Sequence, residues 1–144
     1  MQPDALDWRI INILRNENLP NSTVAGMLKV SEGTIRSRLA RLRKAGVLHV
    51  RAMINPDVLE HQQLAAIGIN LAQTKFLDIK AQEISRLDKV LSVSITSGRY
   101  DLIIELLVDS NKGLVKFLTE TLPQVEGIST TETFLMLKNY RKYV

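Results

Sequence analysis

Hydrophobic residues recur with a helical period near the start of the chain. Leu6, Ile10 and Ile13 lie three or four residues apart behind Asp4, a residue type that favours helix starts. The pattern fades at the polar run 16–18. We therefore expect a first, amphipathic helix that ends near residue 16.

Two more helical segments follow. A loop with Pro20 leads to Asn21 and Ser22, and either of these residues is a suitable N-cap for a short helix that ends near Leu28. A brief turn then reaches Ser31, a suitable N-cap for a third helix of basic sequence. Two short helices joined by so brief a turn, the second one basic, are typical of a helix-turn-helix rather than an open bundle.

The sequence after the third helix predicts a strand. Residues 47–54 are rich in β-branched and apolar side chains and end at Asn55-Pro56. Such a strand would serve both as a wing and as a linker. The polar stretch 57–63 follows, and the hydrophobic pattern changes beyond it. We place the domain boundary here, with a first domain of residues 1–60 and a second of residues 61–144.

Strand-like and helix-like patterns alternate in the second domain. Apolar alternation predicts strands, and helical spacing predicts helices, in the order 64–71, 77–87, 91–95, 100–108, 112–122 and 128–137. The short segment 97–99 suits a hairpin, so the second and third strands should be antiparallel neighbours. The order βαββαβ is that of a ferredoxin-like sandwich. The whole chain is thus expected to be α+β, with a winged helix-turn-helix domain before the ferredoxin-like domain.

One face of such a sheet is covered by the two helices of the same domain, and the other face is not. If the alternation holds, Ile103, Leu107 and Met136 lie on the uncovered face with Ala66 and Gly68. An apolar sheet face in water indicates a partner, most simply a second copy of the chain.

Bulk properties exclude several classes of protein. The chain of 144 residues has 45% hydrophobic and 24% charged residues, an ordinary globular composition. Its longest apolar run is far shorter than the roughly 20 residues of a membrane-spanning helix. The first residues do not resemble a signal peptide, so we expect a cytoplasmic protein with no membrane partner. There is no cysteine, and His49 and His61 lack metal-ligand spacing, so we expect no metal and no cofactor.

Positive charge is concentrated in one segment. The chain has a net charge of +4, whereas residues 29–51 carry seven cations and one anion, a net charge of +6. A local basic excess of this kind is what a phosphate-binding surface requires. A solvated surface helix would also carry cations, but it would not explain the tight turn, the N-cap and the glycine stop around them.

A helical wheel of residues 31–45 separates a buried stripe from a candidate DNA-binding face. Ile35, Leu39 and Leu42 fall on one side and should pack against the first two helices. Small residues on the opposite side let the helix enter a major groove, and long cations at its edges reach phosphates or guanines. The predicted DNA-contacting residues are Ser31, Gly33, Thr34, Arg36, Ser37, Ala40, Arg41 and Lys44. Arg38 lies near the buried stripe, so we expect it to pair with a carboxylate of the same domain.

Several motifs occur in a specific order and spacing. They are Leu6-Asp7, Ser31, Thr34-Ile35, Arg38, Leu42, Gly46-Val47-Leu48, Gly98, Tyr100-Asp101-Leu102 and Thr131-Glu132-Thr133. Over nearly its full length the chain thereby resembles the Lrp/AsnC family of transcription regulators, also called feast/famine regulatory proteins. It departs from the family pattern at Lys29, where glycine is common, and at Asn21, where arginine is frequent.

The resemblance implies dimers built through the C-terminal sheets, further assembly to tetramers or octamers, and a small amino acid bound between dimers. A candidate pocket lies at the hairpin, where Gly98 amides suit a carboxylate and Asp101 suits an ammonium group. The candidate ligand-binding residues are Gly98, Arg99, Tyr100, Asp101, Thr131 and Thr133. The alternative is structural, because glycine turns chains, aspartate caps turns and threonine is common in strands.

Two other functions fit the same architecture. Haem-pathway decarboxylases resemble this family, but they depend on cavity histidines, and here His49 and His61 lie in the expected wing and linker. A protein that only assembles or stores an effector would not need a basic third helix. We therefore expect a sequence-specific DNA-binding transcription regulator and not an enzyme. Its expected partners are double-stranded DNA, copies of itself and a small amino-acid effector.

Overall fold

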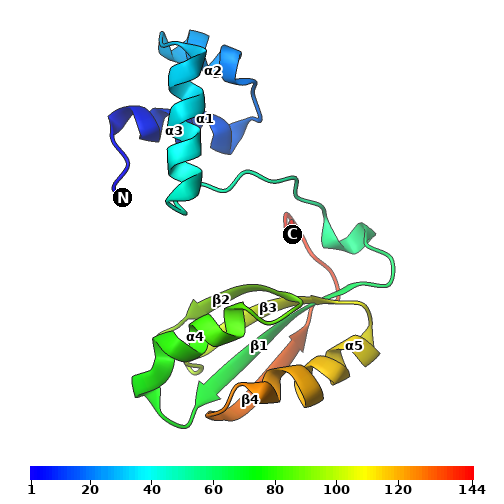
Figure 1. Ribbon diagram of the computed structural model, residues 1–144. Coiled ribbons are helices and arrows are strands. Elements are labelled where there is room, and N and C mark those ends of the chain that lie inside the picture. Colours follow the sequence, from blue (N-terminus) through cyan, green and yellow to red (C-terminus); the bar gives the residue numbers. More distant parts are fainter. The chain divides into compact units, whose positions relative to one another are not determined.

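A computed structural model describes the whole chain, residues 1–144. The chain forms two compact units, Met1–Ala52 and Met53–Val144 (Figure 1). Each unit has a hydrophobic core of its own. No helix in either unit has the length and apolar character needed to cross a membrane.

The first unit ends at Ala52, earlier in the chain than the domain boundary that was predicted after residue 60. The segment after residue 53 belongs to the second unit because C-terminal residues hold it. Ile54 and Val144 exchange two backbone hydrogen bonds of 3.0 Å. Asp57 accepts hydrogen bonds of 3.1 Å and 2.7 Å from the backbone and side chain of Asn139.

The first unit consists of three helices, α1 (Ala5–Asn16), α2 (Asn21–Leu28) and α3 (Glu32–Lys44). This confirms the predicted helix-turn-helix. Asp4 caps α1 by accepting a hydrogen bond of 2.9 Å from the Asp7 N–H, and the Asp7 carboxylate accepts one of 3.0 Å from the Asp4 N–H. This reciprocal pair satisfies two backbone donors that the first helical turn would otherwise leave without a partner.

The start of α2 differs from the prediction. Its N-cap is Pro20, which makes no side-chain hydrogen bond, and Asn21 and Ser22 lie inside the helix. Proline fixes its own backbone near the φ of −58° found here, so the helix begins directly after it without a polar cap.

The turn between α2 and α3 contains a residue in the left-handed region. Lys29 has φ 55° and ψ 46°, and the Val30 N–H donates a hydrogen bond of 3.1 Å to the Ala25 carbonyl. This pattern closes a helix end, and it favours glycine because a Cβ atom strains the left-handed backbone.

We expect Lys29→Gly to stabilise the first unit by about 1 kcal/mol, because glycine relieves the strain of this turn. Lys29→Ala is the matched control, since it removes the same charge but keeps a Cβ atom. Thermal unfolding followed by circular dichroism should give a higher midpoint for the glycine variant than for the alanine variant. Equal midpoints would show that the turn is not strained.

The predicted strand over residues 47–54 is wrong for this chain. After α3 the backbone turns at Gly46, with φ 68°, and then runs without regular structure to Pro56. A strand needs a neighbour for its backbone hydrogen bonds, and among residues 49–54 only Ile54 has one. The first unit is therefore a helix-turn-helix without a wing strand.

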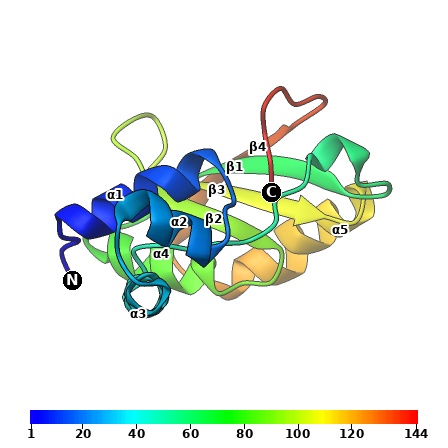
Figure 2. The same cartoon turned by 90° about the horizontal axis from the view of Figure 1, so that it is seen from above.

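The second unit is a four-stranded antiparallel sheet with two helices on one face, and the order βαββαβ is confirmed. Its elements are β1 (Gln63–Leu71), α4 (Leu77–Ser85), β2 (Val90–Ile95), β3 (Leu102–Val108), α5 (Asn111–Lys116) and β4 (Ile128–Leu135). The strands lie in the order β2-β3-β1-β4. Figure 2 shows α4 and α5 on one side of the sheet and the loop between β2 and β3 on the other.

The predicted helix over residues 112–122 is regular only in its first part. After Lys116 it continues as a π-helical turn, Phe117–Thr121, and a 3-10 turn, Leu122–Gln124. Pro123 lies in that last turn and has no N–H to continue an α-helical ladder. Phe117 and Leu122 nevertheless reach the core of this unit.

The strand register assigns side chains to the two faces of the sheet. Ile67 pairs with Ile104 on β3 and Thr133 on β4, and Ile67 and Ile104 belong to the core beneath the helices. The next residue, Gly68, pairs with Ile103 on the open face. Ile103 and Leu107 thus lie on the open face, as predicted, and Ile103 is exposed.

Candidate DNA-binding face and effector loop

The recognition-helix candidate, α3, is capped as predicted. The Ser31 hydroxyl accepts a hydrogen bond of 3.1 Å from the Thr34 N–H, and the two hydroxyl oxygens lie 2.8 Å apart. Ile35, Leu39 and Leu42 are buried, which confirms the predicted core stripe. The opposite side of α3 is therefore free to face solvent.

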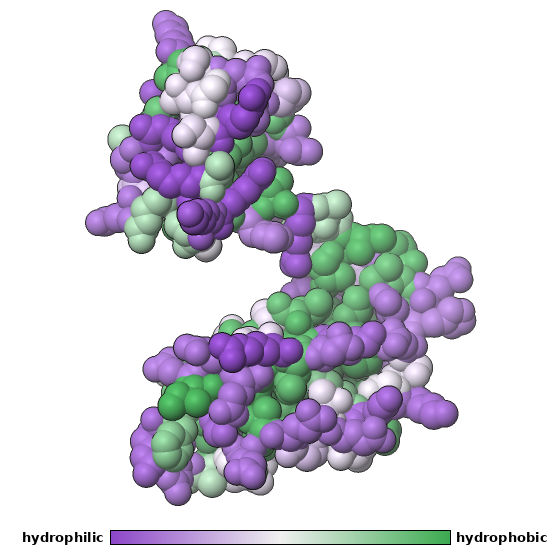
Figure 3. Space-filling view, viewed as in Figure 1, coloured by the Kyte–Doolittle hydropathy of each residue, from purple (hydrophilic) through white to green (hydrophobic).

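The predicted DNA-contacting residues lie together on that opposite side. All of them are exposed except Thr34, which is half-buried. In Figure 3 hydrophilic residues dominate the side of the first unit on which α3 runs, with paler, weakly polar patches between them. Small residues along the centre and cations at the edges are the arrangement that the wheel predicts for a groove-binding helix.

A shallow hollow follows the first half of this face. It is lined by Ser31, Gly33, Thr34, Ser37, Arg38 and Arg41. Five of these six residues are predicted DNA contacts, and the sixth, Arg38, had been expected to pair with a carboxylate of the same domain. Arg38 therefore lies at the edge of the candidate interface.

The arginines of α3 differ in how they are held. Arg38 donates to Asp4 at 2.5 Å and to Asp7 at 2.9 Å, which confirms that it pairs with carboxylates of its own unit. Arg41 donates to Asp7 at 2.6 Å, a contact that the sequence did not indicate. Arg36 pairs only with Glu32, one turn earlier on the same exposed helix surface, at 2.8 Å.

The ion pair with Arg38 makes the first unit sensitive to acid. Hydrogen bonds from the Arg38 guanidinium and the Asp7 N–H lower the pKa of Asp4 from 3.8 to about 2. A carboxylate whose pKa is lower in the folded state stabilises that state above its unfolded pKa and loses this contribution as the pH falls through the folded pKa.

We therefore expect the unfolding midpoint of Asp4→Asn to lie below that of the natural sequence near neutral pH, because the natural carboxylate binds Arg38. The difference should shrink below about pH 4 and vanish only well below about pH 2, where Asp4 is protonated in both states. Circular dichroism melts across this range measure it. A difference that stays constant from neutral to acid pH would contradict the assignment.

The candidate effector loop joins β2 to β3 and is tied to the end of β1. The Asp101 carboxylate accepts a hydrogen bond of 2.8 Å from the Leu71 N–H through Oδ2. The Asp101 N–H donates one of 3.1 Å to Asn70, and the Thr96 hydroxyl bonds the Tyr100 carbonyl. Gly98 has open space around it and no left-handed φ, so the turn does not require glycine there.

Tyr100 covers part of the open sheet face. Its ring lies over Gly68, where an added Cβ atom would be 2.6 Å from ring carbons. The Phe134 ring meets it edge-on, with the ring centroids 6.2 Å apart. The Arg99 guanidinium lies 5.7 Å from the Tyr100 centroid and 4.0 Å from the Glu132 carboxylate. Arg99, Tyr100 and Asp101 are thereby brought to one end of the open face.

The two threonines predicted to join this loop lie on the other side of the sheet. Thr131 and Thr133 pair with Ile69 and Ile67, whose side chains face the helices. The residue that the structure adds to the loop is Asn70, which also donates a hydrogen bond of 3.2 Å to Thr130. The strand period shows that Thr131 and Thr133 share one face of β4, but only the register with β1 shows which face it is.

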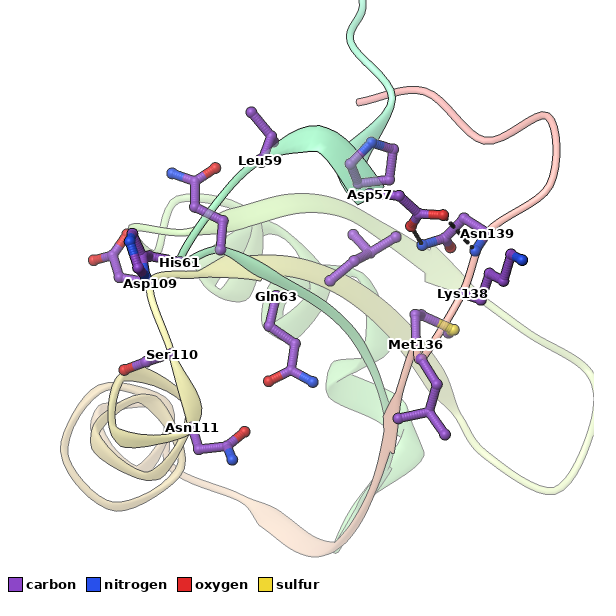
Figure 4. Close-up of a pocket in the computed structure, with 14 residues that line it drawn as sticks. Asp57, Leu59, His61, Gln63, Asp109, Ser110, Asn111, Met136, Lys138 and Asn139 are labelled. Atoms are coloured by element: carbon purple, nitrogen blue, oxygen red, sulfur yellow. Dashed lines mark hydrogen bonds between the residues drawn. The ribbon is translucent and has the colours of Figure 1, made fainter.

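A separate pocket of about 580 Å³ lies at the start of β1 (Figure 4). Figure 4 shows the Asp57–Asn139 hydrogen bonds on one side of it and Ser110 and Asn111, at the start of α5, on another. The hydrogen bonds from Asn139 lower the pKa of Asp57. This pocket could not be predicted from the sequence, because segments far apart in the chain line it.

Two family models match the sequence, one in each unit. Residues 4–43 match the AsnC-type helix-turn-helix domain. Residues 64–143 match the Lrp/AsnC ligand binding domain. Together the two models cover most of the chain.

Similar proteins are named as regulators, not as enzymes. The HTH-type transcriptional regulator FL11 of Pyrococcus abyssi is 28% identical over 141 residues, which cover 96% of this chain and 92% of that protein. The regulatory protein AsnC of Haemophilus influenzae is 25% identical over 138 residues, covering 94% and 92%. The structure of AsnC from E. coli matches with a TM-score of 0.69 at 26% identity, covering 96% and 95%. These names decide against the decarboxylase alternative.

Proposed function

Because the chain belongs to the Lrp/AsnC family of transcription regulators, we propose that it binds specific DNA sequences through α3 and responds to a small amino acid bound by its second unit. The observation that carries the first part is the exposed face of α3, where small residues lie between cations while the opposite stripe is buried. The similar regulators of Pyrococcus abyssi and Haemophilus influenzae come from cells without a nucleus, in which DNA lies in the cytoplasm, so the proposal includes a cytoplasmic location.

The proposed DNA contacts are the residues of that face. Ser37 and Ala40 are small enough to let α3 approach base edges, whereas Arg36, Arg41 and Lys44 extend to phosphates or guanines. The hydroxyls of Ser31 and Thr34 lie at the helix start, where backbone N–H groups also favour a phosphate.

The proposed effector site is the loop of Gly98, Arg99, Tyr100 and Asp101. Only Oδ2 of Asp101 is used by the Leu71 N–H, so Oδ1 remains available for the ammonium group of an amino acid. Arg99 supplies a cation for the carboxylate. Thr131 and Thr133 face the other side of the sheet, so they would reach an effector only from another copy of the chain.

Assembly through the open sheet faces is part of the same proposal. Ile103, Phe134 and Leu107 leave apolar surface there that the helices of this unit do not cover. A homodimer that buries this surface, and assembles further to a tetramer or octamer, would place effector loops of different copies near one another. An effector can alter DNA binding only if it binds one assembly state better than another.

A thermal-shift screen against the standard amino acids tests the effector site. A ligand that binds the folded chain raises its unfolding midpoint by mass action. We expect the shift to be lost in Asp101→Asn, which keeps an acceptor for the Leu71 N–H but removes the charge for an ammonium group. Asp78→Asn, an exposed change on α4, is the control and should keep the shift. A full shift in the Asp101 variant would place the effector elsewhere.

A further inference from the structure

Asp7 is the only buried charged residue of the chain, and it lies behind the DNA-binding face. Its side chain is 0% exposed although it belongs to the first turn of α1. A buried carboxylate is costly unless hydrogen bonds and opposite charges compensate it. The groups that bind the Asp7 carboxylate therefore indicate its role.

Both oxygens of Asp7 are occupied, and from different elements. Oδ1 accepts from Nη1 of Arg38 at 2.9 Å. Oδ2 accepts from Nη2 of Arg41 at 2.6 Å and from the Asp4 N–H at 3.0 Å. The carboxylate is thus fixed by the backbone N–H of the α1 N-cap, Asp4, and in turn holds two guanidinium groups of α3.

The two arginines keep donors free for another ligand. A guanidinium has five N–H donors in a rigid plane, and the Arg41 side chain remains 50% exposed after one of its NH₂ groups binds Asp7. Arg38 is 26% exposed. Both side chains line the hollow along α3 together with Ser31, Thr34 and Ser37.

The other cations of α3 are not anchored in this way. Arg36 is 71% exposed, and its partner Glu32 is itself on the surface. Arg43 and Lys44 are exposed and make no ion pair. A side chain that is already ordered loses less conformational freedom when it binds, so an anchored arginine binds at a lower entropic cost than a free one.

We propose that Asp7 is a positioning residue of the DNA interface, whose buried carboxylate holds Arg38 and Arg41 so that their free N–H donors line the hollow and receive base edges, most simply those of guanine, in the major groove. The inference rests on the proposed function of α3. Asp4 and Asp7 balance the charges of Arg38 and Arg41, so this cluster contributes directed hydrogen bonds rather than net charge. The long-range attraction to DNA then comes mainly from Arg43 and Lys44, because Glu32 balances the charge of Arg36.

Matched lysine substitutions separate positioning from charge. Arg41→Lys keeps the charge but loses the planar set of donors, and Arg43→Lys makes the same change at an unanchored position. A duplex is first selected from a random-sequence pool by its binding to the natural chain, and is called the enriched duplex. Each full-length variant is then titrated with this duplex and with the unselected pool. We expect Arg41→Lys to weaken binding to the enriched duplex about 10-fold and Arg43→Lys by less than about 2-fold.

The salt dependence of binding provides the second readout. Neither lysine variant changes the number of cations, so the slope of log affinity against log salt should stay that of the natural chain in both. If Arg41 acted only through its charge, Arg41→Lys would leave the affinity for the enriched duplex unchanged. Equal affinities of the Arg41 and Arg43 variants would overturn the inference.

Asp7→Asn tests the carboxylate itself, with Glu32→Gln as a control for the added positive charge. If Asp7 only neutralised arginines, both variants would bind the enriched duplex and the pool more tightly. If it positions them, Asp7→Asn should lower the preference for the enriched duplex about 10-fold while Glu32→Gln keeps it. Should Asp7→Asn unfold the first unit, the lysine pair decides, because it leaves Asp7 in place.

Failure of the proposed function gives a different result. Two results together would refute DNA binding by this face, and the inference with it. The natural chain would enrich no sequence, and a variant without the α3 cations would bind the pool as tightly as the natural chain. A natural chain that prefers its enriched duplex, together with indistinguishable Arg41→Lys and Arg43→Lys variants, would refute the positioning role of Asp7 alone.

Discussion

The full chain with Arg36→Ala and Lys44→Ala together is expected to bind its enriched duplex about 100-fold more weakly than the natural sequence. Both side chains are exposed on α3, and neither belongs to the cluster around Asp7. The loss should be similar for an enriched and a random duplex, because phosphate contacts carry no sequence information. The slope of log affinity against log salt should become flatter by about two.

The control removes the same charge from the second unit. Arg86→Ala with Lys112→Ala replaces two exposed cations that lie outside the helix-turn-helix. We expect this control to change DNA affinity by less than about 3-fold, since distant exposed charges are screened by salt. Equal losses in the two double variants would mean that overall charge, and not the α3 face, governs binding.

Gly68→Ala is expected to destabilise the second unit by about 2 kcal/mol, because the new methyl group collides with the Tyr100 ring on the open sheet face. Urea unfolding measures this cost. In a Tyr100→Ala background the same substitution should cost less than about 0.5 kcal/mol, since the ring is then absent. Gly98→Ala is the control, because open space surrounds Gly98 and the change should be nearly neutral.

An equal cost of Gly68→Ala with and without Tyr100 would contradict this packing. The contact matters for function because Tyr100 belongs to the proposed effector loop. A ring seated over Gly68 fixes the loop against β1, next to the Asn70 and Leu71 contacts of Asp101.

The helix-turn-helix could be predicted from the sequence because its signals are local. The stripe of Ile35, Leu39 and Leu42 follows the helical period, and the Ser31 cap bonds a residue only three positions away. Pairing of Arg38 was predicted because it lies near that stripe. The Asp7–Arg41 contact was not, since it joins residues 34 positions apart and depends on how α1 packs on α3.

The strand errors have a different cause. Residues 47–54 have the composition of a strand, but composition does not supply a neighbour for the backbone hydrogen bonds. The face of Thr131 and Thr133 was equally hidden, because β4 is an edge strand whose residues are mostly exposed on both sides. Only the register with β1 decides which side they face.

Because the chain has no cysteine, a single introduced thiol can report whether α3 lies against DNA. Ser37→Cys places a single thiol at the centre of the exposed α3 face, and Ser85→Cys places one on α4 of the second unit. The rate of maleimide modification is measured with and without a saturating amount of the enriched duplex. If α3 enters the major groove, bound DNA should slow modification of Ser37→Cys about 10-fold or more and leave that of Ser85→Cys unchanged. Equal rates for Ser37→Cys in the free and DNA-bound protein would contradict it.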